Sequence, residues 1–176
     1  RQQIAVVLDD LGADAIKTGM LHDVSVIEAV CDELTARARG VPLVVDPVMI
    51  AKGGHPLIAT DAVATLKSRL LPLATVITPN LPEAEALVGR PIRDVPGMRE
   101  AAAALRGLGV PAVLLKGGHL DGDVVTDLLV TADGAEEFVS PRIATRHTHG
   151  TGCTLASAIA TGLAQGMSLR GSVVRA

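Results

Sequence analysis

The sequence predicts an α/β fold in which a mostly parallel β-sheet carries helices on both faces. Short apolar runs of strand type alternate with segments whose apolar residues recur at helical spacing. The strand-type runs are almost continuously apolar, which is typical of strands that are buried on both faces. With 176 residues, 48% of them hydrophobic and 20% charged, the chain is expected to form one domain with a substantial core.

In the first half of the chain, strand and helix patterns alternate, broken by Gly40-Val41-Pro42. The segment from Pro47 to Pro56 is a glycine-bearing loop, and Thr60 or Asp61 is the expected cap of the helix that follows it. The expected elements are a helix around 4–11, a strand at 13–16, a turn at 17–20, a helix at 27–38, a strand at 43–45, a helix from 60 or 61 to about 71 and a strand at 75–78.

The second half continues the alternation and adds a hairpin. Pro82 suits the first turn of a helix, and Ala132-Asp133-Gly134 suits the turn between two strands. The expected elements are helices at 83–88 and about 98–108, a strand at 112–115, hairpin strands at 124–130 and 136–139, a helix at about 153–164 and a last helix reaching Ala176.

The unusual residues of the chain collect directly after the expected strands. In an open parallel sheet, ligands bind in the crevice beyond the carboxyl ends of the strands. The segments at that position are 17–20, 46–49, 78–80, 116–118 and the loop at Gly150. We therefore expect the functional site at this edge of the sheet.

A glycine-rich turn, Thr148-His149-Gly150-Thr151-Gly152-Cys153-Thr154, opens directly into a helix. Its backbone N–H groups and the positive end of the helix dipole form an anion site that could hold a phosphate. The alternative is a tight turn that uses glycine only for its dihedral freedom. His149 is interpreted as a structural support of the turn.

Cys153 lies in the first turn of that helix, where the dipole is expected to lower the pKa of a thiol. The thiol could then act as a general base on a hydroxyl group, or it could simply be a small buried hydrophobe. Cys31 falls in an apolar helical stripe and is expected in the core. The wide separation of the two cysteines indicates neither a zinc site nor a disulfide framework.

Carboxylates and lysines at strand ends are further candidates. Asp46 follows an apolar strand and Glu83 stands one helical turn past Asn80, so both could hold Mg²⁺. Alternatively, Asp46 caps its loop and Glu83 favours a helix N-terminus. Lys52 and Lys116 each precede a glycine pair, which lets the backbone approach phosphates, although surface solvation is the simpler interpretation for Lys52.

Composition argues against several classes of partner. A formal net charge of −3 leaves no basic footprint for nucleic acid, and one Phe with no Trp or Tyr leaves little for base stacking. No apolar run is long enough for a bilayer, and the start of the chain lacks a signal-peptide pattern. We therefore expect a small-molecule partner, no membrane contact and a cytoplasmic setting.

Four blocks in the same order resemble the hydroxymethylpyrimidine/phosphomethylpyrimidine kinases. They are Asp46-Pro-Val-Met49, Thr78-Pro-Asn-Leu-Pro-Glu-Ala-Glu85, Leu115-Lys-Gly-Gly-His119 and His149-Gly-Thr-Gly-Cys-Thr154. The resemblance implies a ribokinase-like three-layer α/β fold and a homodimer. It also implies phosphorylation, by ATP and Mg²⁺ in thiamine biosynthesis, of 4-amino-5-hydroxymethyl-2-methylpyrimidine and then of its monophosphate.

The resemblance also implies roles for individual residues. Residues Gly150, Thr151 and Gly152 would form the anion hole for the transferring phosphoryl group, and Cys153 would take the hydroxyl proton. The remaining assignments are nucleotide binding by Lys116, Asn80, Thr148 and Glu83, magnesium binding by Asp46 and Glu83, and pyrimidine binding by Met20 and Val48. Residues 1–176 are expected to form a single kinase domain that lacks its N-terminal strands and its extreme C-terminus.

Three alternatives remain open from the sequence. A pyridoxal kinase of the same fold would accept a similar flat ring that bears a hydroxymethyl group. Cys153 with His149 could form a thiol hydrolase pair, although no third orienting residue is evident and the glycine turn suits phosphate. A nucleotide-binding module without catalytic activity is the third.

Overall fold

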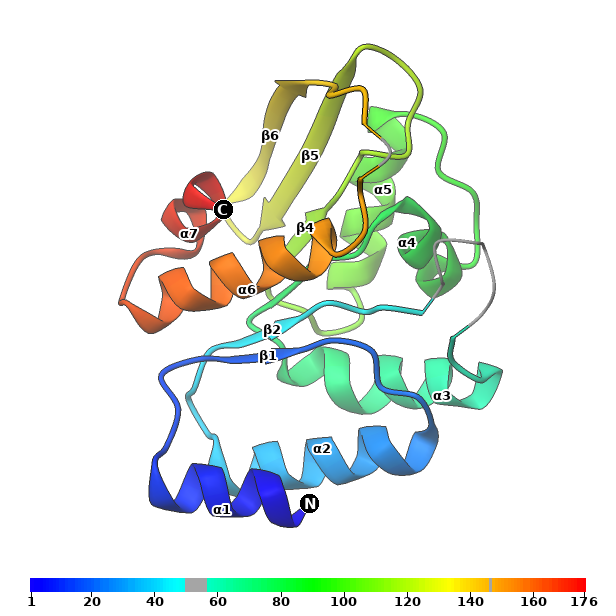
Figure 1. Ribbon diagram of the computed structural model, residues 1–176. Coiled ribbons are helices and arrows are strands. Elements are labelled where there is room, and N and C mark those ends of the chain that lie inside the picture. Colours follow the sequence, from blue (N-terminus) through cyan, green and yellow to red (C-terminus); the bar gives the residue numbers. More distant parts are fainter. Residues whose placement is uncertain (50–56, 146) are drawn as a thin grey trace.

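A six-stranded sheet organises the chain in the computed structural model, which describes residues 1–49, 57–145 and 147–176 (Figure 1). The strands lie in sequence order from β1 to β6; the first four are parallel, and the last three pair antiparallel. Their bounds are β1 Ile16–Thr18, β2 Leu43–Val45, β3 Val76–Ile77, β4 Val113–Leu115, β5 Val124–Thr131 and β6 Gly134–Pro141.

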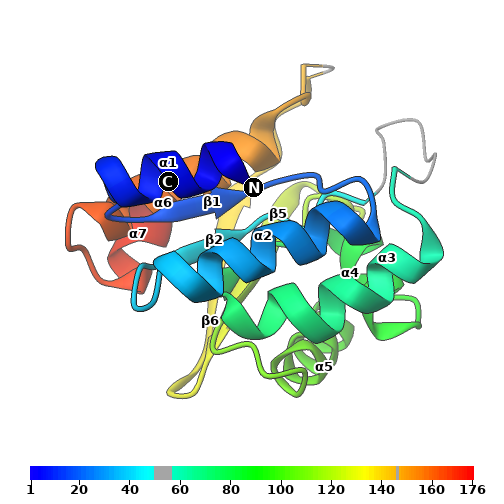
Figure 2. The ribbon, with the colours of Figure 1, turned by 90° about the horizontal axis from the view of Figure 1, so that it is seen from below.

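Helices cover the sheet on two sides (Figures 1 and 2). Helices α2 to α5 connect successive strands and lie on one face, α6 and α7 lie on the other, and α1 packs against α2. Among the described residues, none of the helices combines the length and apolar character that a bilayer span requires. The bounds are α1 Gln2–Asp10, α2 Val24–Arg37, α3 Thr60–Thr65, α4 Leu81–Val88, α5 Val95–Arg106, α6 Thr151–Ala164 and α7 Leu169–Arg175.

Successive side chains of the central strands point to opposite faces of the sheet, and they form two separate cores. In β2, Leu43 and Val45 pack with the α2–α5 layer, whereas Val44 packs with Ile159 of α6. Residues of β3 and β4 divide in the same way, because successive side chains of a strand point to opposite faces. The two cores confirm the expected three-layer arrangement, and Cys31 lies in the larger one, as predicted.

The parallel strands end at one edge, and this alignment positions the site. The N–H of Asp46 donates to Thr18 O at 3.0 Å, and the N–H of Thr78 donates to Val45 O at 3.0 Å. An isolated bridge pairs Asn80 with Lys116 just beyond β3 and β4. The polar residues that follow β1, β2, β3 and β4 therefore lie at the same edge of the sheet.

Two expectations about the first strand are wrong. We expected a strand at 13–16 and a turn at 17–20, but β1 covers Ile16–Thr18. The strand begins where Ile16 N–H donates to Pro42 O, and its parallel register with β2 then includes Lys17 and Thr18. Pairing with a neighbouring strand therefore overrides the local turn signal.

The expected single helix from residue 60 or 61 to about 71 is also divided. Ala59 is the N-cap of α3 and makes no side-chain cap, while the Asp61 carboxylate accepts the N–H of Ala62 inside the helix. The side chain of Thr60 lies outside the described residues. A π-helical turn (η1, Leu66–Leu70) and a 3₁₀ turn (η2, Leu71–Leu73) follow, and the proline in η2 cannot continue an α-helical ladder.

Other boundaries shift by one to three residues. Helix α5 begins at Val95 because the Asp94 side chain caps it, accepting the N–H of Gly97 at 2.7 Å. Helix α6 begins at Thr151, so the glycine turn forms its first turn. The hairpin is confirmed, with β5 and β6 pairing from Val124–Pro141 to Thr131–Gly134.

Candidate active site

Asp46, directly after β2, lies at the centre of the polar edge and is 1% exposed. Its Oδ1 accepts from Lys116 Nζ at 3.2 Å and from Thr78 Oγ1 at 3.3 Å. Its Oδ2 lies 3.7 Å from Lys17 Nζ and has no hydrogen-bond partner among the described residues. Two ammonium groups thus compensate one buried carboxylate.

The glycine turn presents backbone donors toward this edge. Gly150 has φ 79°, a left-handed conformation that suits glycine, and as N-cap of α6 it offers no side chain to cap the helix. The first helical N–H to find an acceptor is that of Thr154, which donates to Gly150 O at 2.9 Å. Within the described part of the chain, the N–H groups of residues 151–153 have no protein acceptor, so they can receive an anion.

Lys116 joins the carboxylate to the glycine turn. A Cβ placed on Gly152 would lie 2.8 Å from Lys116 Nζ, so the lysine side chain passes directly over that glycine. The same Nζ contacts Asp46 at 3.2 Å. Glycine at position 152 thus leaves room for the lysine in this position, and a side chain there would push the ammonium group aside.

The Cys153 thiol is exposed on the first turn of α6 beside Asp46. Partial burial raises the pKa of Cys153, and the neighbouring Asp46 carboxylate raises it further, while Lys17 and Lys116 act in the opposite direction. The sequence predicted a pKa lowered by the helix dipole, and this expectation is wrong because burial and the Asp46 carboxylate, which the sheet brings close to the thiol, both raise the pKa. The thiol is therefore neutral at ordinary pH and has a carboxylate within reach.

Glu83 combines a structural contact with an unusual charge environment. Asn80 and Glu83 form a capping box at the start of α4: Glu83 N–H donates to Asn80 Oδ1, and Asn80 N–H donates to Glu83 Oε2, both at 2.9 Å. Burial raises the pKa of Glu83 to about 7, with Asp46 raising it further and Lys116 and the Asn80 hydrogen bond lowering it. The alternative in which Glu83 stabilises a helix N-terminus is thus confirmed. The charge of Asp46 also affects the pKa of the Glu83 carboxyl group.

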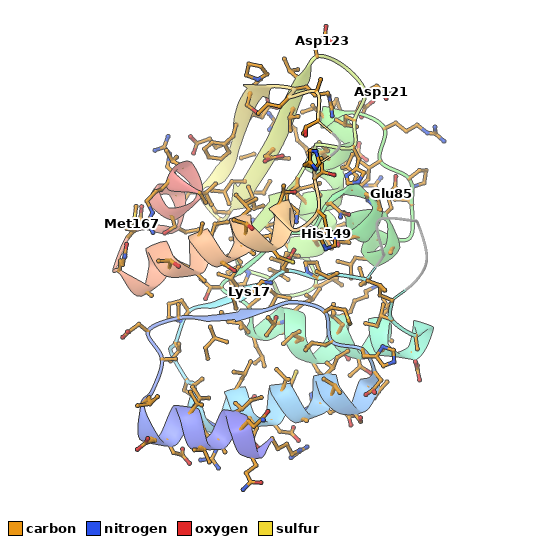
Figure 3. All side chains as sticks on the ribbon, viewed as in Figure 1. Lys17, Glu85, Asp121, Asp123, His149 and Met167 are labelled. Carbon is orange, nitrogen blue, oxygen red and sulfur yellow. The ribbon has the colours of Figure 1, made fainter. Side chains whose placement is uncertain are left out.

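The other predicted residues lie around this centre. Met20 is half-exposed just beyond β1, and Val48 is half-buried two residues after Asp46. Thr148 is exposed, and its carbonyl accepts from Thr151 Oγ1 at 3.0 Å, a bond within the turn. Figure 3 shows His149 ahead of α6 and Lys17 on β1. Lys52 lies outside the described residues.

Lys17 was missed as a site residue in the sequence. It was assigned to a turn, whereas the structure places it in β1, facing the Asp46 carboxylate. The available signal was position: Lys17 belongs to one of the segments, 17–20, that were expected at the site edge of the sheet.

Comparison with known proteins decides the family. The family model described as phosphomethylpyrimidine kinase matches residues 1–176. This chain belongs to the phosphomethylpyrimidine kinase family. The resemblance of the four sequence blocks is thereby confirmed.

Curated relatives of this family match nearly the whole chain. The chain is 52% identical over 174 residues to the thiamine biosynthesis bifunctional protein ThiED of Geobacter sulfurreducens, covering 99% of the chain and 35% of that protein. It is 49% identical over 171 residues to the hydroxymethylpyrimidine/phosphomethylpyrimidine kinase of Streptomyces coelicolor, covering 96% and 62%. The chain thus spans less than two thirds of the length of these relatives.

Solved structures of kinases share the fold. An ADP complex of Bacillus subtilis pyridoxal kinase superposes with a TM-score of 0.92 at 37% identity, covering 99% of this chain and 66% of that one. Phosphomethylpyrimidine kinase from Clostridium difficile 630 gives 0.86 at 38% identity, covering 98% and 70%. These similarities confirm the ribokinase-like α/β fold, which kinases for two different rings share.

Proposed function

We propose that this protein transfers the γ-phosphoryl group of ATP to the hydroxymethyl group of 4-amino-5-hydroxymethyl-2-methylpyrimidine, and then phosphorylates the monophosphate, in thiamine biosynthesis. One observation carries the proposal. The free N–H groups at the start of α6, the Cys153 thiol and the Asp46 carboxylate with its two lysines share one edge of the sheet. The curated relatives named for this activity support the choice of substrate.

The glycine turn and the lysines would do most of the catalytic work. Phosphoryl transfer depends chiefly on positioning and on stabilisation of charge on the transferring group. The N–H groups of Thr151, Gly152 and Cys153 would bind the oxygens of the γ-phosphoryl group, and Lys116, above Gly152, would neutralise part of their charge. Lys116, with Asn80 and Thr148 nearby, is assigned to the nucleotide.

Cys153 would receive the proton of the substrate hydroxyl late in the transfer. Its raised pKa favours the protonated thiol, so the resting group cannot simply act as a thiolate. Asp46 beside it can accept the thiol proton as the hydroxyl proton arrives. The pair begins with one proton, on the thiol, and ends with two, one on the sulfur and one on the carboxylate. Met20 and Val48, which follow the neighbouring strands β1 and β2, are assigned to the pyrimidine ring.

The residues present also fit a magnesium ion. Mg²⁺ commonly takes one or two carboxylates together with phosphate oxygens and waters. Asp46 provides a buried Oδ2 that has no hydrogen-bond partner among the described residues. Glu83 lies close enough for the charge of Asp46 to raise its pKa. The described residues hold no cluster of three or more potential ligands, which agrees with an ion carried mainly by phosphate. When bound, the ion would neutralise charge on the nucleotide phosphates.

Pyridoxal phosphorylation is a second candidate activity. It is favoured by the close match to the Bacillus subtilis pyridoxal kinase and by a pyridoxal kinase from Staphylococcus aureus in complex with AMP-PCP, with a TM-score of 0.89 at 34% identity. The thiol hydrolase alternative is disfavoured because the pKa of Cys153 is raised, whereas a nucleophilic cysteine needs a lowered one.

Substrate competition tests the proposal. The full-length enzyme should be given Mg²⁺-ATP with the pyrimidine alcohol, its monophosphate or pyridoxal, and kcat/KM should be measured for each. The proposal predicts that kcat/KM for the pyrimidine alcohol exceeds that for pyridoxal and that the monophosphate is also a substrate. Preference for pyridoxal would support the second candidate, and hydrolysis of a thioester without phosphorylation would support the hydrolase.

We also propose that residues 1–176 act as a single kinase domain within a cytoplasmic homodimer. The two core clusters share one sheet, which supports the single domain. The homodimer rests on the family resemblance, and the cytoplasmic setting is the expectation stated from the sequence. Sedimentation of the full-length protein at micromolar concentration should give the mass of a dimer.

A further inference from the structure

A single guanidinium group holds the loop that follows Lys116, residues 117–123, hereafter the Lys116 loop. Arg142 donates to three of its carbonyl oxygens: Nε to Gly122 O at 2.7 Å, Nη1 to Gly118 O at 2.9 Å and Nη2 to Leu120 O at 2.5 Å. Figure 3 shows Asp121 and Asp123 at the outer end of this loop, which Arg142 thus ties down along its length.

The inner end of the loop is fixed by a second contact. Gly117 N–H donates to Asp127 Oδ1 of β5 at 2.8 Å. A Cβ on Gly117 would lie 1.9 Å from Thr126 O, so the backbone of the loop rests directly on β5. Lys116 itself bridges Asn80, and its N–H donates to Pro79 O at 2.9 Å, so the loop leaves a fixed strand end and Arg142 holds the part that continues from it.

Arg142 also belongs to the segment that leads into the glycine turn. It directly follows β6, its own N–H donates to Asp123 O at 2.8 Å, and the chain then runs to Gly150 at the start of α6. Arg142 therefore connects the Lys116 loop to the segment that leads into the glycine turn. These two parts of the chain meet where Lys116 lies over Gly152.

The chemistry of these contacts requires arginine. The acceptors are three neutral carbonyl groups spread over five residues, and the guanidinium group reaches them with fixed donors in one plane. A lysine would offer the same charge from a single point and could not reproduce this fork. Because these acceptors are backbone atoms, the Arg142 guanidinium group holds the conformation of the loop and does not serve to bind an anion.

We propose that Arg142 is a positioning residue for phosphoryl transfer, holding the Lys116 loop so that the Lys116 ammonium group stays between Asp46 and the glycine turn. The inference rests on the proposed function, because its effect on catalysis exists only if Lys116 serves the transferring phosphoryl group. Arg142 itself touches none of Asp46, Lys116 or Cys153 through a hydrogen bond or ion pair found among the described residues.

The test compares Arg142→Ala and Arg142→Lys with the control Arg170→Ala in the full-length enzyme. Arg170 of α7 pairs with Glu136 of β6 at 2.6 Å, so the control removes another exposed arginine, one whose partner lies on β6. Both Arg142 variants should lose about 10- to 100-fold in kcat/KM, because small misplacements of a catalytic group have costs of this size. Added ethylguanidinium should restore part of the activity of Arg142→Ala but not of Arg142→Lys.

Amide hydrogen exchange gives a measurement that is independent of activity. Peptides that cover residues 117–123 should exchange faster in both Arg142 variants, with exchange in α2 unchanged. Wild-type kcat/KM in Arg142→Ala, or a loss fully explained by a smaller folded fraction, would overturn the inference. If the wild-type enzyme phosphorylates neither ring, the proposed function has failed instead, and that result is separable because it precedes any substitution.

Discussion

Cys153 shows how a residue's chemistry depends on neighbours that are remote in sequence. At a helix start its thiol was expected to ionise easily, yet Asp46 lies beside it and its pKa is raised. A proton received by Cys153 can therefore be shared with a carboxylate that two lysines hold in place. The pair, more than the thiol alone, is the acceptor in the proposed reaction.

Replacement of Cys153 by Ala should lower kcat by about 10²- to 10⁴-fold, the usual contribution of a general base. Nucleotide affinity should change little, because the N–H groups of residues 151–153 remain. Steady-state turnover and equilibrium titration with a non-hydrolysable nucleotide measure the two quantities. A variant with wild-type kcat would remove the thiol from the mechanism, and Cys31→Ala, in the core, serves as the comparison.

Glu83 should make stability fall as pH rises. Its folded pKa of about 7 exceeds the ordinary 4.5, so the folded state holds the proton more tightly than the unfolded state, and this stabilisation is lost as pH rises toward and through about 7. Glu83→Gln keeps a capping-box side chain and does not titrate. Between about pH 5 and pH 8, its free energy of unfolding should gain about 2–3 kcal/mol relative to wild type.

Urea unfolding of both proteins at the two pH values measures this difference. Exposed Glu28→Gln is the control and should follow the wild-type pH dependence. Equal differences between Glu83→Gln and wild type at both pH values would show that the Glu83 carboxyl group titrates in the folded chain as it does in the unfolded chain.

At the scale of elements, α6 is fixed between the sheet and α7. Its start supplies the anion-binding N–H groups, and its body packs against β1 and β2. Near its end, Gly162 meets the buried Ser172 of α7 so closely that an added Cβ would lie 2.5 Å from Ser172 Oγ and 2.8 Å from Ser172 Cβ. The close approach of α7 therefore helps to set the direction of α6.

Replacement of Gly162 by Ala should destabilise the protein by about 1–3 kcal/mol, because the added methyl group overpacks the α6–α7 contact. The sign is diagnostic, since Gly to Ala inside an uncrowded helix usually stabilises by about 1 kcal/mol. Thermal unfolding measures the effect, with Thr161→Ala on the exposed side of α6 as the control. A more stable Gly162→Ala would mean that α6 and α7 are not in close contact.

Across the whole molecule, the fold was largely predictable because local patterns and tertiary structure agree. Alternating strand and helix periodicity predicted three layers, and the strand-end rule gathered Asp46, Lys116 and the glycine turn at one edge. The start of β1 could not be predicted, because strand pairing decides it. The division of the helix after residue 59 had a visible signal in the proline of η2, which the helical periodicity masked.

The site was predictable only as a set of residue types. Nothing local indicates that Lys17 faces Asp46, that Arg142 reaches three carbonyl groups, or that Asp127 pins Gly117. Each of these contacts joins segments far apart in sequence, and each depends on the register of the sheet. The acid at position 127, the one charged residue of β5, was the available hint.

The most direct measurement is a structure of the full-length enzyme with the pyrimidine alcohol, Mg²⁺ and a non-hydrolysable ATP analogue. We predict the γ-phosphoryl group against the N–H groups of residues 151–153, and the hydroxymethyl oxygen within hydrogen-bonding distance of Cys153 Sγ. A nucleotide bound with its phosphates away from that turn, or a hydroxymethyl group directed away from the thiol, would contradict the proposed mechanism.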